Sequence, residues 1–245
     1  MLLDFSMSEN RESSGSSVEL VSVSSKEGNR EHVDDLNNIE NLYQFDFTEV
    51  GGIVDITNAT NIVALDCEFV GIGNKGRENG LARVSIVSDQ RKIIYDKYVK
   101  VKEPIIDYRT YVSGITPQDL ERGEEYCIVR NEVKFLLEGR IIVGHDLRSD
   151  LKALKLNNFH SSYIRDTSRF PGFDKFKSDR ERTISLKNLM KRIFQIDIQR
   201  GEHDSVEDAK SAMKIYNTYK SDFERRFSQS KYPRNLQISL RPLEQ

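Results

Sequence analysis

The sequence predicts an α/β protein with a mixed central sheet flanked by helices. Three segments of β character come first, over residues 62–69, 81–88 and 92–99, and helical and strand segments then alternate. Adjacent strands followed by alternating helices and strands are typical of α/β domains built on one mixed sheet. Apolar residues make up 37% and charged residues 31% of the 245-residue chain, which is hydrophilic but able to form a core.

The later segments follow from apolar spacing. We expect helices over 126–137, 146–155, 185–194 and 205–219, a short helix beginning at Thr116, and short strands over 140–144 and 163–165. No apolar run approaches the roughly 20 residues that cross a bilayer, and no secretory signal is expected. Cys67 and Cys127 are expected to be reduced core thiols of an intracellular protein.

Acidic and basic residues are unevenly distributed along the chain. Residues 1–60 hold 3 basic and 12 acidic side chains, whereas residues 61–245 hold 34 basic and 27 acidic ones. We predict a disordered acidic arm over 1–50, a folded domain over 61–220 and a polar tail over 224–245. The basic domain suits a polyanionic partner without requiring one. The arm is open to three interpretations, as a solvated tail, a docking segment or a competitor for the basic domain.

Two carboxylates, Asp66 and Glu68, interrupt the apolar first strand. Because side chains alternate along a strand, these two share a face while Leu65, Cys67 and Phe69 point into the core. Neighbouring carboxylates in apolar surroundings repel each other and lose hydration. Mg²⁺ or Mn²⁺ between them removes both penalties, since these ions prefer carboxylate oxygens. The alternative is a strand end with two solvated acids.

Two later segments add chemistry-bearing residues. Asp150 begins a helix that leucines hold on the sheet, although the helix dipole alone also favours an acid there. Asp204 is expected to cap the last long helix, with Glu207 completing a capping box, which leaves Asp208 without a structural role. His203 precedes that helix, and the ordinary pKa of histidine suits proton transfer near neutral pH. A histidine in a loop is equally compatible with a plain surface position.

In order, Asp66-Cys67-Glu68, Asp150 and His203-x₄-Asp208 resemble the signature of the DEDDh exonuclease superfamily, named for four acids and a histidine. Further segments resemble its RNA exonuclease 4 branch, which includes the interferon-stimulated 20 kDa exonuclease: Leu81-Ala82-Arg83-Val84-Ser85, Asp107-Tyr108-Arg109-Thr110, Val112-Ser113-Gly114-Ile115-Thr116, Gly144-His145-Asp146 and Arg165-Asp166-Thr167. The resemblance covers about residues 61–220. One departure is Tyr111, where relatives usually carry arginine.

The resemblance implies an RNase H-like fold and 3′→5′ exonuclease activity that depends on two divalent ions, Mg²⁺ or Mn²⁺. It implies that Asp66, Glu68, Asp150 and Asp208 hold the ions and that His203 is the general base. The implied substrate is the 3′ end of single-stranded RNA, in the processing of RNA such as rRNA in the nucleus or nucleolus. A DNA 3′→5′ exonuclease and a catalytically silent nucleic-acid-binding scaffold are the alternatives. We expect no membrane partner, and the oligomeric state stays open.

Substrate contacts are predicted for four residues. By resemblance, Phe69 and Val70 lie near the terminal nucleotide. Arg83 and Arg109 can meet phosphates, with a buried ion pair as the alternative for each. The loop over 169–182 places phenylalanines among lysines and arginines, a composition suited to stacking bases and holding phosphates. A solvated loop with its phenylalanines tucked inward is the alternative there.

Overall fold

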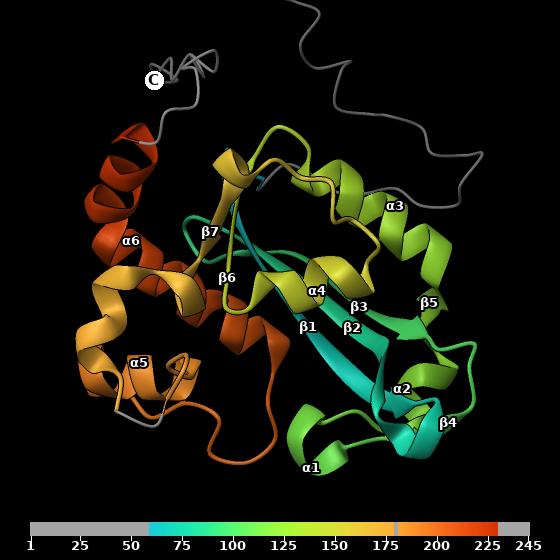
Figure 1. Cartoon of the computed structure of the whole chain (residues 1–245). Helices are drawn as coiled ribbons and strands as arrows, with labels where there is room; N and C mark the ends of the chain where they lie inside the picture. Colours follow the sequence, from blue (N-terminus) through green and yellow to red (C-terminus); the bar gives the residue numbers. More distant parts are fainter. Residues whose placement is uncertain (1–58, 179–180, 230–245) are drawn as a thin grey trace, which may run out of the picture. The chain divides into compact units, whose positions relative to one another are not determined.

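The computed structural model describes residues 59–178 and 181–229, so the predicted acidic arm lies outside the described residues. A seven-stranded sheet has the order β5-β3-β2-β1-β6-β7, with β4 paired to β1 (Figure 1). The strands are β1 Ile62–Ile72, β2 Glu78–Ser88, β3 Ile93–Lys100, β4 Ile105–Asp107, β5 Glu124–Glu125, β6 Ile141–Gly144 and β7 Ile164–Asp166. Because β1, β2 and β3 pair antiparallel while β6 runs parallel to β1 and β7, the sheet is mixed, as predicted.

Helices cover both faces of this sheet (Figure 1). They are α1 Thr110–Ser113, α2 Pro117–Glu121, α3 Tyr126–Leu137, α4 Leu147–Ala153, α5 Leu186–Phe194 and α6 Ser205–Gln229. Val63 and Leu65 of β1 share a core with α3 and α4, whereas Ala64 belongs to the core of α5 and α6. The alternation of β1 therefore places Asp66 and Glu68 on the side of α6. No helix in the described ranges has the length and apolar character needed to cross a membrane.

Local signals explain where several helices begin. Thr116 accepts a hydrogen bond from the Asp119 backbone, and the Asp119 side chain accepts one in return, which is a full capping box for α2. Ser185 caps α5 by accepting from the Asn188 backbone. The segment from 104 to 116 contains the short elements β4 and α1. A three-residue strand and a four-residue helix are too short for a periodic pattern to reveal.

The last helix is ten residues longer than its apolar spacing predicts. Tyr219 interrupts the helical geometry with φ of −110°, yet the helix continues to Gln229. Phe223 beyond it is buried, and Glu224 accepts two hydrogen bonds of 2.8 Å from the buried Arg165. The Arg165 guanidinium also lies 3.7 Å from the ring centre of Phe227. The expected domain end at residue 220 and the first part of the expected tail, 224–229, therefore fall inside α6, because contacts distant in sequence hold this polar segment in place. The rest of that tail, 230–245, lies outside the described residues.

The structure decides which of the cysteine and phenylalanine side chains are buried. Cys67 is buried as predicted, but Cys127 is exposed, because α3 buries the side that carries Val129 and Val133. In the loop over 169–182, Phe170 and Phe173 are buried and pack against α6. These two rings belong to the core, so the inward alternative is confirmed for them and they are not available to stack on bases.

Candidate active site

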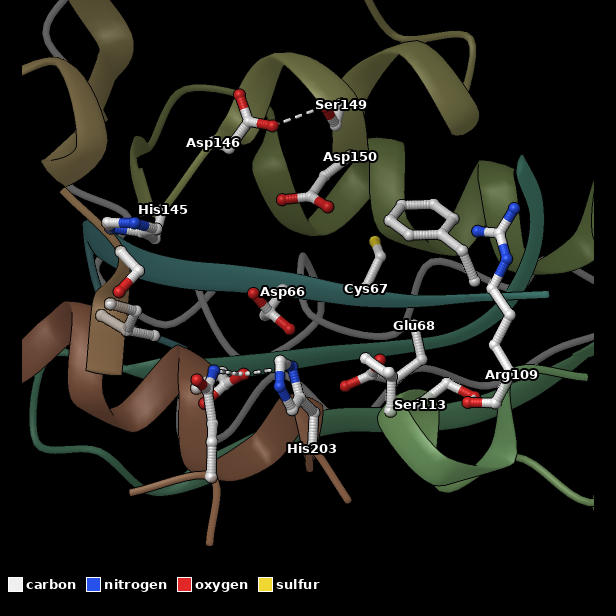
Figure 2. A pocket seen from close by; sticks show the side chains of 16 residues that line it. Asp66, Cys67, Glu68, Arg109, Ser113, His145, Asp146, Ser149, Asp150 and His203 are labelled. Atoms are coloured by element: carbon white, nitrogen blue, oxygen red, sulfur yellow. Dashed lines mark hydrogen bonds and ion pairs between the residues drawn. The ribbon is translucent and has the colours of Figure 1, made fainter. Parts of the chain in front are cut away.

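The site lies where one edge of β1 has no neighbouring strand. β6 pairs with β1 only as far as Ala64, and β4 pairs with it only at Gly71 and Ile72. The chain leaves β6 at Gly144 and turns into α4, so a pocket of about 350 Å³ opens beside the free edge of β1. Figure 2 shows that side chains enter this pocket from β1, α1, α4 and α6.

Four carboxylates predicted from the sequence converge here (Figure 2). Asp66, Glu68 and Asp208 each place one oxygen within 4.8 Å of the others. Asp66 and Glu68 meet because they alternate onto one face, and Asp208 joins them from the first turn of α6. Asp150 approaches from the first turn of α4 and is 4% exposed. Asp150 lies outside the set of three. In Figure 2 it is above Asp66, whereas Glu68 is below Asp66.

Burial and mutual repulsion perturb these acids. Burial, followed by the charges of Asp150, Asp208 and Glu68, raises the pKa of Asp66 well above its ordinary value. Burial and the Asp208 carboxylate raise the pKa of Glu68 to about 8, although Arg83 opposes the shift. Burial raises the pKa of Asp208 to about 6, against a hydrogen bond that lowers it. Four ionised carboxylates in this pocket are therefore unfavourable without a compensating cation.

The carboxylate oxygens fit a divalent ion. Glu68 Oε1, Asp150 Oδ2 and Asp208 Oδ1 are buried, and among the described residues none of the three has a hydrogen-bond partner. Buried carboxylate oxygens without partners are costly, and Mg²⁺ and Mn²⁺ prefer such hard oxygen ligands. Within the described ranges, the pocket lining contains a single arginine and no lysine. The donor set therefore fits Mg²⁺ or Mn²⁺.

His203 stands at the rim beside Asp208. Its backbone N–H donates to the Val112 carbonyl over 2.5 Å, which ties the loop before α6 to α1. The side chain is 35% exposed, and its Nδ1 atom lies 3.8 Å from Asp208 Oδ2. Burial, helped by the charge of Lys187, lowers the pKa of His203 below its ordinary value. The imidazole is consequently neutral at pH 7 and able to accept a proton.

Of the four residues predicted to contact substrate, two line the pocket and two do not. Phe69 and Arg109 line the pocket, whereas the Val70 side chain is fully buried between β1, β2 and α2. The predicted contact between the Val70 side chain and substrate is therefore wrong, because β1 continues past Phe69 and its far end is covered. The Arg109 guanidinium donates to Asn79 Oδ1 over 2.7 Å and to the Gly76 carbonyl over 2.8 Å. These partners are neutral, so its positive charge remains available to an anion.

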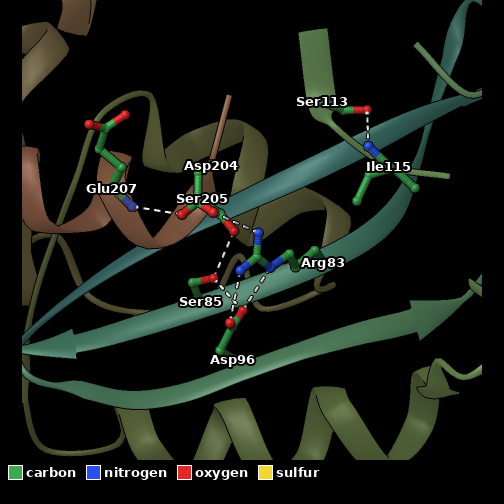
Figure 3. A network of polar contacts seen from close by, with 8 residues as sticks. All are labelled: Arg83, Ser85, Asp96, Ser113, Ile115, Asp204, Ser205 and Glu207. Carbon is green, nitrogen blue, oxygen red and sulfur yellow. Dashed lines mark hydrogen bonds and ion pairs between the residues drawn. The ribbon is translucent and has the colours of Figure 1, made fainter. Parts of the chain in front are cut away.

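Arg83 lies outside the pocket, in the polar network of Figure 3. It donates to Asp96 over 2.8 Å and to Asp204 over 3.2 Å, so the ion-pair alternative is confirmed for this residue. Ser85 and Ser205 join the network through hydroxyls 2.7 Å apart. The Glu207 backbone donates to Asp204, as the predicted cap requires. The network attaches the start of α6 to β2 and thereby places Asp208 one turn later.

Sequence reasoning did not single out three residues of the pocket lining. Gln199 donates from Nε2 to Asp208 Oδ2 over 2.7 Å, and the Ser149 hydroxyl donates to Asp146 Oδ2 over 2.6 Å. Ser185, the cap of α5, also faces the pocket. Gln199 lies in an irregular segment, where no periodicity indicates which side chains point inward. No pattern in the sequence could have identified it.

Comparisons with known proteins agree with this geometry. Residues 63–216 match the Exonuclease family, RNase_T. The chain is 49% identical over 166 residues to RNA exonuclease 4 of Mus musculus, covering 67% of this chain and 38% of the mouse protein. It is 43% identical over 163 residues to RNA exonuclease 4 of Saccharomyces cerevisiae, covering 66% and 56%. The chain thus spans about two-fifths to just over half of these relatives' lengths.

Solved structures give the same result. The Neurospora crassa Pan2 catalytic unit, with protease and nuclease domains, matches with a TM-score of 0.58 and 26% identity, covering 75% of this chain and 32% of that one. The Pan2 pseudoubiquitin hydrolase–RNA exonuclease module of S. cerevisiae, in complex with AAUUAA RNA, matches with a TM-score of 0.56 and 28% identity, covering 69% and 31%. The fold is therefore RNase H-like, as predicted. The chain belongs to the exonuclease family, in the DEDDh superfamily and its RNA exonuclease 4 branch.

Proposed function

We propose that this protein is a metal-dependent 3′→5′ exoribonuclease. The observation that carries the proposal is the convergence of Asp66, Glu68, Asp150 and Asp208 in one pocket beside His203. Three of their buried oxygens have no hydrogen-bond partner in the part of the chain that the structure describes. The names of the relatives and the RNA bound to a structural neighbour favour RNA as the substrate. Processing of structural RNA such as rRNA, in the nucleus or nucleolus, is the setting expected from the resemblance.

The carboxylates would divide between two ions. Asp66, Glu68 and Asp208 would hold one, since their oxygens lie within 4.8 Å of one another. Asp150, on the other side of Asp66, would share the second ion with it, directly or through water. Bound ions of this kind lower the pKa of a water molecule and offset the charge of the phosphate and the leaving oxygen. That positive charge would favour the ionised forms of Asp66 and Glu68, because burial otherwise favours their neutral forms.

His203 would accept the proton of the attacking water. The new bond forms between the water oxygen and phosphorus, the bond from phosphorus to the 3′ oxygen breaks, and the released product carries a 5′ phosphate. A neutral imidazole suits this step, and its lowered pKa keeps it neutral at pH 7. Phe69 would pack against the terminal nucleotide and Arg109 would meet a phosphate, since both line the pocket.

The decisive test uses 5′-labelled single-stranded RNA and a matched DNA, each with Mg²⁺, Mn²⁺ or EDTA, beside an Asp66→Ala control. We expect a ladder that shortens from the 3′ end, requires metal, favours RNA and is absent in the control. A preference for DNA would support the alternative exonuclease. Tight binding without shortening under both metals would identify a binding scaffold instead.

A further inference from the structure

The two oxygens of Asp208 have different surroundings. Oδ1 is buried and has no hydrogen-bond partner within residues 59–178 and 181–229, whereas Oδ2 accepts a 2.7 Å hydrogen bond from the side-chain amide of Gln199. The same Oδ2 lies 3.8 Å from His203 Nδ1. Gln199 therefore engages the oxygen that faces His203, and it leaves Oδ1 as the oxygen available to a cation.

Gln199 is itself held in place. The Lys187 ammonium donates to its backbone carbonyl over 2.8 Å, and its neighbour Ile198 is buried in the core of α5 and α6. Its φ of 52° lies in the left-handed region, which is unfavourable for a residue other than glycine. Such a conformation persists only where the surroundings impose it, and here it accompanies a side chain directed into the pocket.

The terminal torsion of an aspartate is soft, so a carboxylate needs a partner to fix its plane. Gln199 supplies that partner as a neutral donor. A lysine or arginine at this point would add a positive charge that repels a cation nearby. An amide fixes the carboxylate without such repulsion.

We propose that Gln199 is a positioning residue of the metal site, which fixes Asp208 with Oδ1 free for a divalent ion. The inference rests on the proposed function and deepens it. Partners of this kind orient a metal ligand, and their loss typically weakens metal affinity by about 10–100-fold.

The test is a calorimetric titration of the full chain with Mn²⁺ alone, in the absence of RNA. Gln199→Met removes the donor while nearly matching the side-chain size, and should weaken Mn²⁺ binding by about 10–100-fold. Gln199→Asn keeps an amide that is one methylene too short and tolerates the left-handed backbone, so it should weaken binding as well. The matched control is Gln118→Met on the exposed side of α2, which should bind Mn²⁺ as the wild type does.

A double-variant cycle separates positioning from a general structural effect. In an Asp208→Asn background, Gln199→Met should cause no further loss of Mn²⁺ affinity, because Gln199 acts through Asp208. Equal affinity of the wild type and both Gln199 variants would overturn the inference, and so would a full additional loss in the Asp208→Asn background. A wild-type chain that binds no Mn²⁺ would overturn the proposed function itself, which keeps the two failures distinct.

Discussion

Two aspartates one turn apart at the start of α6 have opposite environments. The side chain of Asp204 is 51% exposed and Arg83 lies 3.2 Å away, whereas that of Asp208 is 6% exposed and faces other carboxylates. Burial is the largest single influence and raises the pKa of Asp204, but the hydrogen bond from the Glu207 backbone together with the charge and hydrogen bond of Arg83 outweighs it and holds this pKa below its ordinary value. Burial raises that of Asp208 to about 6. The same residue type is thus a structural ion-pair partner at one position and an uncompensated charge at the next.

This contrast shows how the fold uses the positive charge of Arg83. Arg83 stands directly across the ladder from Glu68, yet its guanidinium turns away to Asp96 and Asp204 (Figure 3). The arginine therefore fixes the geometry that brings Asp208 to β1 without neutralising the pocket. The charge balance of the pocket is left to a cation from solution.

The largest effect should come from Asp66, the acid proposed to serve both ions. Asp66→Asn should lower the rate of RNA hydrolysis by about a thousandfold or more, since bound metal supplies several kcal/mol of charge stabilisation. The metal-free variant should nevertheless have a higher Tm than the wild type, because a neutral amide replaces a buried carboxyl group whose ionised form the fold disfavours. Single-turnover kinetics and calorimetric melting in EDTA check the two parts. A lower Tm would show that the pocket acids are already compensated within the protein.

A smaller loss is expected at the proposed base. His203→Ala should reduce the rate by about 10²–10⁴-fold while Mn²⁺ affinity stays within about twofold of the wild type. The reason is that His203 approaches Asp208 only to 3.8 Å and is not one of the clustered ligands. Rate and Mn²⁺ titration are measured on the same sample. Wild-type rates would remove the base assignment, and loss of Mn²⁺ binding would make His203 a ligand instead.

How far the sequence could predict this site depends on the spacing of each residue. The two-residue period of a strand places Asp66 and Glu68 on one face, and Asp150 and Asp208 stand at helix starts. Local patterns leave alternatives for each, and the resemblance to the exonuclease signature is what assigns all four to one site. Val70 lies on the same strand face as Asp66 and Glu68. However, β1 continues to Ile72, and packing against α2 covers the Val70 side chain. That covering depends on residues about 45 positions later in the chain, beyond the reach of a local pattern.

Other features have no local signal at all. The end of α6 depends on the ion pair between Arg165 and Glu224, 59 residues apart, and its sequence there reads as a polar tail. The alternatives for Arg83 and Arg109 were equal in the sequence, because only the fold decides whether a carboxylate lies within reach. The sequence therefore indicated which residues are candidates for the site, but it did not indicate which distant residues each of them contacts.

The pH dependence of stability should separate the two aspartate environments. The folded protein raises the pKa of Glu68 from 4.5 to about 8, so between these values the folded state binds more protons than the unfolded state. Metal-free stability should then be highest near pH 4.5 to 5 and fall towards pH 8, by up to about 1.4 kcal/mol per pH unit for each proton. Asp204, with its lowered pKa, contributes stability above its unfolded value of 3.8 that is lost only in stronger acid.

Urea unfolding in EDTA at pH 5, 6, 7 and 8 measures this slope, and the same series in Mn²⁺ is the control. Mn²⁺ should flatten or reverse the fall, because the bound cation favours the ionised acids. A metal-free stability that rises across this range would contradict the raised pKa of Glu68.

The smallest effects should distinguish the two arginines. Arg83→Met removes charged hydrogen bonds to Asp96 and Asp204 and should cost about 1–3 kcal/mol of unfolding free energy, with the KM for RNA within about twofold of the wild type. Arg109→Met is the matched substitution at a residue that lines the pocket and whose guanidinium donates to the neutral oxygens of Asn79 and Gly76. It should raise KM roughly tenfold, as the loss of a charged hydrogen bond to phosphate requires, with a smaller cost in stability.

Urea unfolding and steady-state kinetics on both variants make the comparison. If Arg83→Met raised KM as much as Arg109→Met does, the network of Figure 3 would belong to the RNA-binding surface as well as to the scaffold. The opposite outcome, a shared loss of stability with unchanged KM, would leave Arg109 without a substrate role. Because the substitution is the same at both sites, any divergence between the two variants reports only where each arginine directs its charge.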